Sequence, residues 1–411
     1  MSQLVPDGRN GVATRGESRS WRVGFGATLA LAMGISPVVL YSLNVLSPFV
    51  ISDLGLSRTA FGSLASLSFA VAIPCSYFGG RAVDRIGGRR LLFGLVVTAI
   101  ISVLLVARAD AFGWLVGAAA VAGLSQSMAN PVTNHLVSAF VRRGHQGMLM
   151  GVKQSGVQMS QFATGIALPP LALLIGWRGA MTALLVPAFG ALALAGRFVP
   201  PDAANREAVP RGSSGAGRAV AWWLCGYLFL VGVAIQAANA YLPLYAFEVL
   251  GLPAALAGSL AGIVGGVGVV SRLGWGWVGG RSPDPGRLLT ALAVAATVAF
   301  AAIAAAGSIG GVPLLIVGVA GYAATAAAAN VVVMLAVVQT APRGTTGRAT
   351  GILAIGLFSG FACGPVAFGA LVDATGSYRL GWILAAAFCA ASAVAAAGWR
   401  RSVQAAPTVA G

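Results

Sequence analysis

Twelve uninterrupted apolar runs decide what this chain can fold into. Each run is about 20 residues long, the length that a helix needs to cross the hydrocarbon core of a bilayer. The runs are continuous rather than alternating, which excludes a closed barrel of strands. We therefore expect an all-α integral membrane protein with twelve transmembrane helices, at residues 23–51, 60–80, 91–107, 112–139, 148–175, 179–198, 221–248, 255–279, 288–306, 312–339, 349–371 and 378–398.

The distribution of charge supports this topology and orients it. Only 9% of the residues are charged and the mean hydropathy is +0.86, too apolar for a water-soluble surface. The net charge of +16 could indicate nucleic-acid binding, but the arginines gather in alternate loops. The opposite loops hold only Arg58, Arg108, Arg178 and Arg379. This positive-inside bias predicts a multi-pass protein of the bacterial inner membrane with both termini in the cytoplasm, and no nucleic-acid partner.

The chain divides into two halves that resemble each other. Leu54-Gly55-Leu56 and Gly62-Ser63-Leu64 recur 196 residues later, as Leu250-Gly251-Leu252 and Gly258-Ser259-Leu260. Such a repeat favours two pseudo-symmetric six-helix bundles around a central site. The expected parts are an N-terminal tail, a first bundle, a Pro-, Gly- and Arg-rich linker, a second bundle and a C-terminal tail, at residues 1–22, 23–199, 200–218, 219–400 and 401–411.

A short loop between the second and third runs carries the most specific motif. It places a glycine, an Asp-Arg pair, a second glycine and an Arg-Arg pair at fixed spacing: Gly80, Asp84, Arg85, Gly87, Arg89 and Arg90. The pattern resembles the signature loop of the major facilitator superfamily of secondary transporters, and the resemblance covers essentially the whole chain. It implies transport by alternating access, without enzymatic activity. It also implies that these six residues form a conformational latch, in which Asp84 meets the start of helix 11 near Arg343 or Arg348.

The same resemblance implies that helices 1, 4, 7 and 10 line a central cavity, beside helices 2, 5, 8 and 11. The polar residues within the apolar runs fall largely on these helices, whereas helices 3, 6, 9 and 12 are almost purely apolar and Gly. Polar amides in lipid are costly unless satisfied, so they indicate either a wet cavity or interhelical hydrogen bonds. As a set we interpret them as substrate-binding residues: Tyr41, Asn44, Gln126, Asn130, Lys153, Gln154, Gln158, Gln236, Asn239, Tyr241, Tyr322 and Asn330.

Lys153 is the only lysine among 26 basic residues, and it lies within helix 5. A charge at membrane depth indicates a functional site, and an ammonium suits a carboxylate or another small anion. The alternative is that its long side chain extends to the nearby interface. Arg272, nearer the end of helix 8, is expected to brace the helix end and the loop between helices 8 and 9.

We therefore expect a secondary transporter for a small organic anion. No carboxylate lies deep in any span, and the four cysteines show no metal-ligand spacing. We expect no metal or cofactor, a monomer in the lipid bilayer, and a proton or counter-anion as a candidate coupling partner. The stretch from Gly369 to Tyr378 is similar to that of monocarboxylate and oxalate/formate carriers. Proton-coupled efflux of drug-like or neutral metabolites is the alternative, and a non-transporting membrane sensor is a different class.

Overall fold

The computed structural model describes residues 19–141, 143–201, 217–282, 284–340 and 346–405, and within these it is helical without strands. Ten helices are long and apolar enough to span a membrane. One of them, Met148–Phe198, contains a break at Gly176, and the pair Arg19–Ile35 and Val38–Val45, bent by 51°, forms a further span. Counted this way, the described residues hold the twelve spans that the apolar runs predict, which confirms the fold class.

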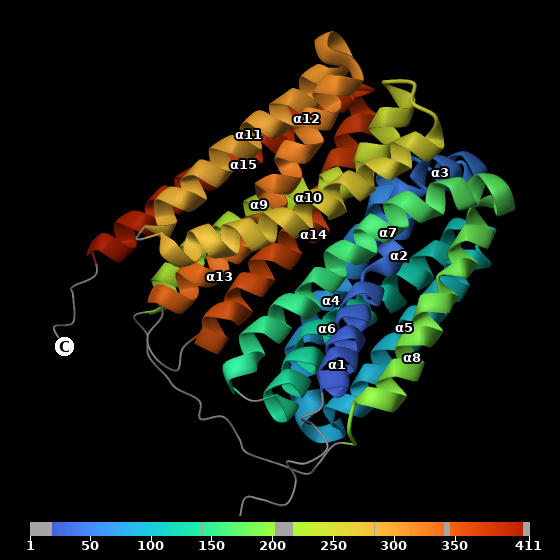
Figure 1. Ribbon diagram of the computed structural model, residues 1–411. Helices are drawn as coiled ribbons and strands as arrows, with labels where there is room; N and C mark the ends of the chain where they lie inside the picture. Colours follow the sequence, from blue (N-terminus) through green and yellow to red (C-terminus); the bar gives the residue numbers. More distant parts are fainter. Residues whose placement is uncertain (1–18, 142, 202–216, 283, 341–345, 406–411) are drawn as a thin grey trace, which may run out of the picture.

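The helices of the two halves alternate in direction between two ends of the molecule (Figure 1). The first half consists of α1 (Arg19–Ile35), α2 (Val38–Val45), α3 (Ser47–Leu54), α4 (Arg58–Ile86), α5 (Gly88–Ala107), α6 (Phe112–Phe140), α7 (Arg143–Ala183) and α8 (Leu185–Phe198). The second consists of α9 (Gly217–Glu248), α10 (Ala254–Arg281), α11 (Pro285–Ala305), η1 (Ala306–Gly310), α12 (Gly311–Ala324), η2 (Ala326–Ala328), α13 (Ala329–Thr340), α14 (Thr346–Thr375) and α15 (Tyr378–Ala405).

The internal repeat is visible in the backbone. Helix α4 begins at Arg58 and α10 at Ala254, 196 residues later. The turns before them are made by Gly55 and Gly251, with φ of 60° and 68°. Gly176 and Gly376, 200 residues apart, have φ of 74° and 67°. Left-handed backbone of this kind favours glycine, so the repeated glycines fix equivalent turns in both halves.

We call the two ends of the molecule the Arg58 end and the Arg89 end. The Arg58 end holds the starts of α4 and α10 and the turn between α14 and α15. The Arg89 end holds the turn between α4 and α5 and both ends of the described chain, at Arg19 and Ala405. Figure 1 shows the two bundles side by side, joined toward the Arg58 end.

The bundles meet along two helix pairs, α4 with α14 and α7 with α10. Glycines bring the second pair into contact. A Cβ at Gly165 would overlap the backbone of Gly262, and a Cβ at Gly265 would overlap Phe162 and lie 2.8 Å from the backbone oxygen of Gln158. Small residues let helices approach closely in lipid, where packing rather than water exclusion drives association. At these glycines α7 and α10 leave no room for larger side chains in this conformation.

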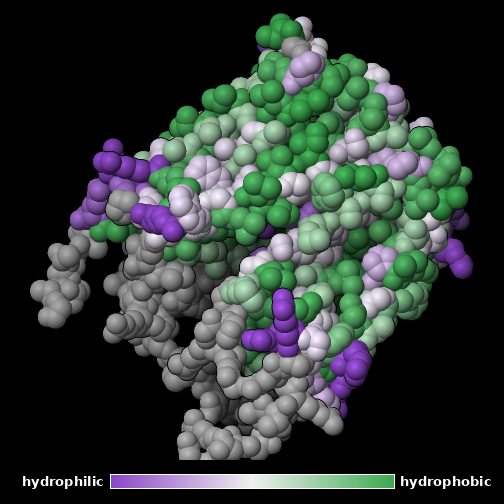
Figure 2. All heavy atoms as spheres, in the orientation of Figure 1, coloured by the Kyte–Doolittle hydropathy of each residue, from purple (hydrophilic) through white to green (hydrophobic). Residues whose placement is uncertain are grey.

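The outer surface suits a bilayer. Figure 2 shows apolar side chains over much of the visible face, with strongly hydrophilic ones near its edges. Large apolar side chains such as Leu174 and Val186 are 80% and 76% exposed. Contiguous exposure of this kind is rare on soluble monomers and marks a surface that meets lipid.

Candidate functional site

Lys153 is the centre of a polar cluster between α7 and α6. Its ammonium Nζ donates to Asn134 Oδ1 at 2.5 Å, to Thr133 Oγ1 at 2.9 Å and to Asn130 Oδ1 at 3.4 Å. The asparagines are four residues apart and therefore lie on one face of α6. The face of α6 that carries the two predicted asparagines thus contacts the predicted lysine of α7.

Lys153 does not extend toward the interface. The residue is 1% exposed, and α7 begins at Arg143, ten residues before it, which corresponds to about 15 Å of helical rise. The sequence places this helix start near residue 148, so α7 begins five residues earlier than expected, and Lys153 is buried within the protein. Among the described residues no carboxylate forms an ion pair with it. A charged group that has only neutral partners within a membrane is stabilised when a counter-ion binds to it.

The partners of Lys153 open toward the Arg89 side of the site. Asn130 and Asn134 are exposed, although they lie in a membrane-spanning helix, whereas Gln158 and Gln161, nearer the Arg58 end of α7, are buried. The amides that surround the ammonium are therefore accessible from outside the protein.

A second polar cluster joins the bundles nearer the Arg58 end. Gln161 Nε2 on α7 donates to Asn239 Oδ1 on α9 at 3.0 Å, and Tyr322 OH on α12 donates to the same oxygen at 2.9 Å. Asn239 Nδ2 donates to Gln236 Oε1 at 3.3 Å. Because Gln161 belongs to the first half and the others to the second, this network crosses the bundle interface.

Three further predicted residues carry buried polar atoms without a hydrogen-bond partner among the described residues. They are Gln154 Oε1, Asn44 Nδ2 and Asn330 Oδ1. Leaving such a group unpaired costs about 1–3 kcal/mol, so water or a ligand is expected to pair with it. Gln158 is fully buried, and its side-chain amide lies close to Gly268 on α10.

Two predicted residues are engaged elsewhere. Gln126 Nε2 donates to Ser68 Oγ at 3.0 Å and so joins α6 to α4. Tyr241 OH donates to the backbone oxygens of Arg58 and Pro365, at 2.5 and 3.0 Å. Both side chains form hydrogen bonds between helices in this conformation. The sequence left this alternative to a cavity-lining role open for each polar residue.

Arg272 and Tyr41, the two remaining polar residues singled out in the sequence, lie near each other. Arg272 on α10 interacts electrostatically with Tyr41 and Tyr322, and its Nη2 donates to the backbone oxygen of Ala327 at 3.1 Å. Ala327 lies in η2, where the helical ladder between α12 and α13 is interrupted. This contact joins α10 to the η2 segment rather than to the loop after α10, and the bracing of that loop stays a prediction.

Sequence reasoning missed Thr133 and Ser68. Thr133 also donates to the Ala129 backbone oxygen at 2.6 Å, so its hydroxyl serves the helix and the ammonium together. Its place three residues after Asn130 is the signal that could have included it, because residues three apart share a helix face.

The signature loop is described only in part. Gly87 ends α4 and precedes α5 with φ of 99°, so the turn favours glycine there. Arg89 donates to the Gly196 backbone oxygen at 3.3 Å and lies over Phe93, while Arg85 and Arg90 are exposed. The side chains of Asp84, Arg343 and Arg348 lie outside the described residues, and the latch stays a prediction.

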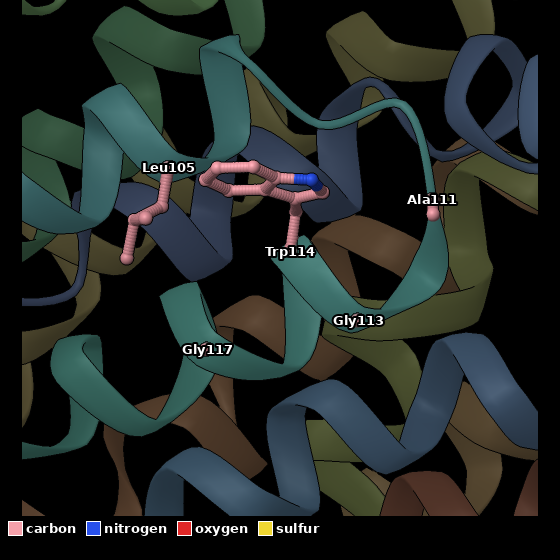
Figure 3. Close-up of a pocket in the computed structure, with 5 residues that line it drawn as sticks. All are labelled: Leu105, Ala111, Gly113, Trp114 and Gly117. Atoms are coloured by element: carbon pink, nitrogen blue, oxygen red, sulfur yellow. The ribbon is translucent and has the colours of Figure 1, made fainter.

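Two surface hollows lie at the Arg58 end, away from Lys153. One, of about 390 Å³, is a shallow apolar depression between α5 and α6 (Figure 3), lined by Leu105, Ala111, Gly113, Trp114 and Gly117. None of its lining residues is charged. The other, of about 310 Å³, is polar and joins the bundles, with Arg58, Glu248, Asp373 and Tyr378 among its lining residues.

Comparisons with known proteins agree with this architecture. The sequence profile of the Major Facilitator Superfamily matches residues 29–337. Among solved structures, a bacterial homologue of the human lysosomal transporter Spinster, in an inward-facing and occupied conformation, is similar with a TM-score of 0.72, 15% identity, and coverage of 94% of this chain and 98% of that one. The nucleoside transporter NupG is similar with a TM-score of 0.72, 14% identity, and coverage of 91% and 99%. No curated protein matches by sequence.

Proposed function

The chain belongs to the Major Facilitator Superfamily, and on that premise we propose that it carries a small organic anion, such as a carboxylate, across the bacterial inner membrane. The fold supports secondary transport by alternating access, and the protein is a carrier rather than an enzyme. The proposed carrier acts as a monomer, with a proton or counter-anion as its coupling partner.

The observation that carries this proposal is the surroundings of the Lys153 ammonium. Three side-chain oxygens, all from neutral residues, accept its hydrogen bonds. Neutral oxygens hold a cation in place without cancelling its charge, so the site retains an attraction for an anion. Because Asn130 and Asn134 are exposed, a carboxylate can approach the ammonium by replacing one of them.

The second cluster suits the rest of such a substrate. Gln236, Asn239 and Tyr322 present amide and hydroxyl groups, and Gln154, Asn44 and Asn330 have unpaired atoms that need donors or acceptors. Hydroxyl or amide groups on a small carboxylate would pair with them. Lys153 then selects charge, while the amides select the shape of the uncharged part.

The arrangement of the bundles supports an inward-facing state. Among the described residues, the ion pair and several hydrogen bonds between the halves lie at the Arg58 end, and the exposed amides lie on the side of the Arg89 end. The positive-inside bias assigns the Arg89 end to the cytoplasm. The similar Spinster homologue was also captured facing inward.

This orientation predicts the result of a labelling experiment. A cysteine introduced at Ser57, at the start of α4, should react with a membrane-impermeant maleimide added to intact spheroplasts. A cysteine at Ser213, in the central linker, should react only after the cells are opened. The exposed native Cys363 is removed in both variants. Labelling in the reverse order would invert the assignment.

The experiment that tests the function is a ligand panel on purified protein. A ligand that binds only the folded state at 100 times its Kd stabilises the protein by about 2.7 kcal/mol, which appears as a rise in Tm. Small mono- and dicarboxylates should raise the Tm, whereas neutral sugars and cationic drugs of similar size should not. Stabilisation by neutral or cationic compounds alone would instead favour the efflux of drug-like metabolites.

A further inference from the structure

The start of α4 is held by side chains that come from the other bundle. Asp373, on α14, accepts hydrogen bonds from the backbone N–H of Arg58 at 3.2 Å and of Thr59 at 2.8 Å, and from Thr59 Oγ1 at 2.5 Å. The next backbone N–H of the helix, that of Ala60, is bound by Ser57 Oγ at 3.1 Å. A helix leaves its first four N–H groups without partners inside the helix. Two of these four are therefore satisfied across the bundle interface.

The side chain of Arg58 forms a second set of contacts with the C-terminal bundle. Its Nη2 forms an ion pair with Glu248, at the end of α9, at 2.7 Å. Its Nε donates to Tyr378 OH at 3.4 Å, and that hydroxyl donates to Glu248 at 2.9 Å. Tyr241 OH closes the group by donating to the Arg58 backbone oxygen. Four elements, α4, α9, α14 and α15, thus meet at one residue.

This junction is not required by the fold, because the repeat lacks it on the other side. At the repeat spacings of 196 and 200 residues, Arg58 corresponds to Ala254 and Asp373 to Leu173. The equivalent helix pair, α10 with α7, meets through glycines such as Gly258, Gly262 and Gly165. One side of the Arg58 end is therefore closed by apolar packing and the other by charged hydrogen bonds.

We propose that Asp373 is a positioning residue of the transport cycle, which holds the Arg58 end closed by capping α4 from the opposite bundle, together with the Arg58–Glu248 ion pair. The proposal rests on alternating access, in which this end must open. On opening, the start of α4 loses the hydrogen bonds to Asp373, and Arg58 loses its ion pair with Glu248, because both carboxylates move with the second bundle. The closed state is favoured by contacts that the open state lacks, which is the requirement for any residue that biases such an equilibrium.

The test measures the opening directly, without a substrate. Spin labels are attached through non-cysteine chemistry at Gly113 on α6 and Ser308 in η1, two exposed positions at this end on different bundles. Distances between them are measured by electron paramagnetic resonance in lipid nanodiscs. Asp373→Ala should raise the population of the longer distance by about fivefold, the effect of losing a water-exposed charged hydrogen bond of about 1 kcal/mol. Glu248→Gln should raise it as well.

The chain offers a matched control. Arg178 and Asp53 form an ion pair of the same length, 2.7 Å, with a similarly exposed arginine and a more exposed carboxylate, at the same end but within the first bundle. Asp53→Asn should leave the distance distribution unchanged. Thr59→Val, which removes only the hydroxyl donor to Asp373, gives a milder variant should the alanine variant fold poorly, and it should shift the population in the same direction.

Unchanged distances in both Asp373→Ala and Thr59→Val, or an equal shift in Asp53→Asn, would overturn the proposal. Because the readout does not depend on which substrate is carried, failure here leaves the anion proposal standing. Failure of the ligand panel, in turn, leaves the role of Asp373 standing.

Discussion

Replacing Lys153 by glutamine should weaken the binding of an anionic substrate by ~1.5–3 kcal/mol, the range for a hydrogen bond to a charged group. Glutamine keeps much of the length of lysine and can still bond to Asn130 and Asn134, but it removes the positive charge. The measurement is isothermal titration of purified protein with a carboxylate that stabilises the wild type. Lys153→Arg should retain part of the affinity, since the charge remains while its geometry changes.

A second variant separates charge from structure. Asn134→Asp places a carboxylate at the 2.5 Å contact with the Lys153 ammonium. This internal anion should compete with the substrate and weaken its binding, while the protein stays folded because a buried charge has gained a partner. A purely structural lysine would tolerate this change without loss of affinity. Unchanged affinity in Lys153→Gln and Asn134→Asp together would remove the anion proposal's main support.

Replacing Asp84 by asparagine should abolish or sharply slow transport while leaving folding largely intact. Asp84 lies at the Arg89 end of α4. When the bundles close at that end, we expect its carboxylate to contact the positive N-terminal end of α14, the eleventh span, and the nearby Arg343 or Arg348. Without this contact the cytoplasmic side no longer closes in the cycle. The measurement is uptake into proteoliposomes at matched protein density.

The control for Asp84 is Asp110, an exposed carboxylate at the Arg58 end. Asp110→Asn should transport normally, since among the described residues its carboxylate forms no ion pair with the other bundle. Full transport by Asp84→Asn at normal expression would rule out the latch. If the latch and the Asp373 junction both act, the two ends are closed by different carboxylates in opposite states of the cycle.

The sequence predicts the helices and the repeat well because both depend on local pattern. A continuous run of apolar residues must become a helix in lipid, since the other structure that satisfies the backbone there, a closed barrel, has alternating apolar and polar residues. The glycines of the repeat, such as Gly55 and Gly251, were detected by spacing and adopt matching left-handed turns. The cluster around Lys153 was partly predictable for the same reason, because Asn130 and Asn134 are spaced for one helix face.

The contacts between bundles could not be predicted in this way. Asp373 and Thr59 are 314 residues apart, and Arg58 and Glu248 are 190 apart, so no local pattern links them. Tyr241 illustrates the same limit. Its position on α9, the seventh span, predicts that it lines the cavity. Its hydroxyl instead donates hydrogen bonds to backbone oxygens of α4 and α14. Which helices approach at a given level depends on the packing of both bundles.

Transport by the purified protein tests the central proposal most directly. Proteoliposomes are given a labelled carboxylate that raises the Tm of the protein, and uptake is compared between the wild type, Lys153→Gln and empty liposomes. We expect saturable uptake by the wild type and competition by other small carboxylates but not by neutral sugars. In Lys153→Gln the Km should rise at least about tenfold, as a loss of ~1.5 kcal/mol or more implies. Equal uptake by the wild type and Lys153→Gln, or competition by neutral compounds alone, would contradict the proposal.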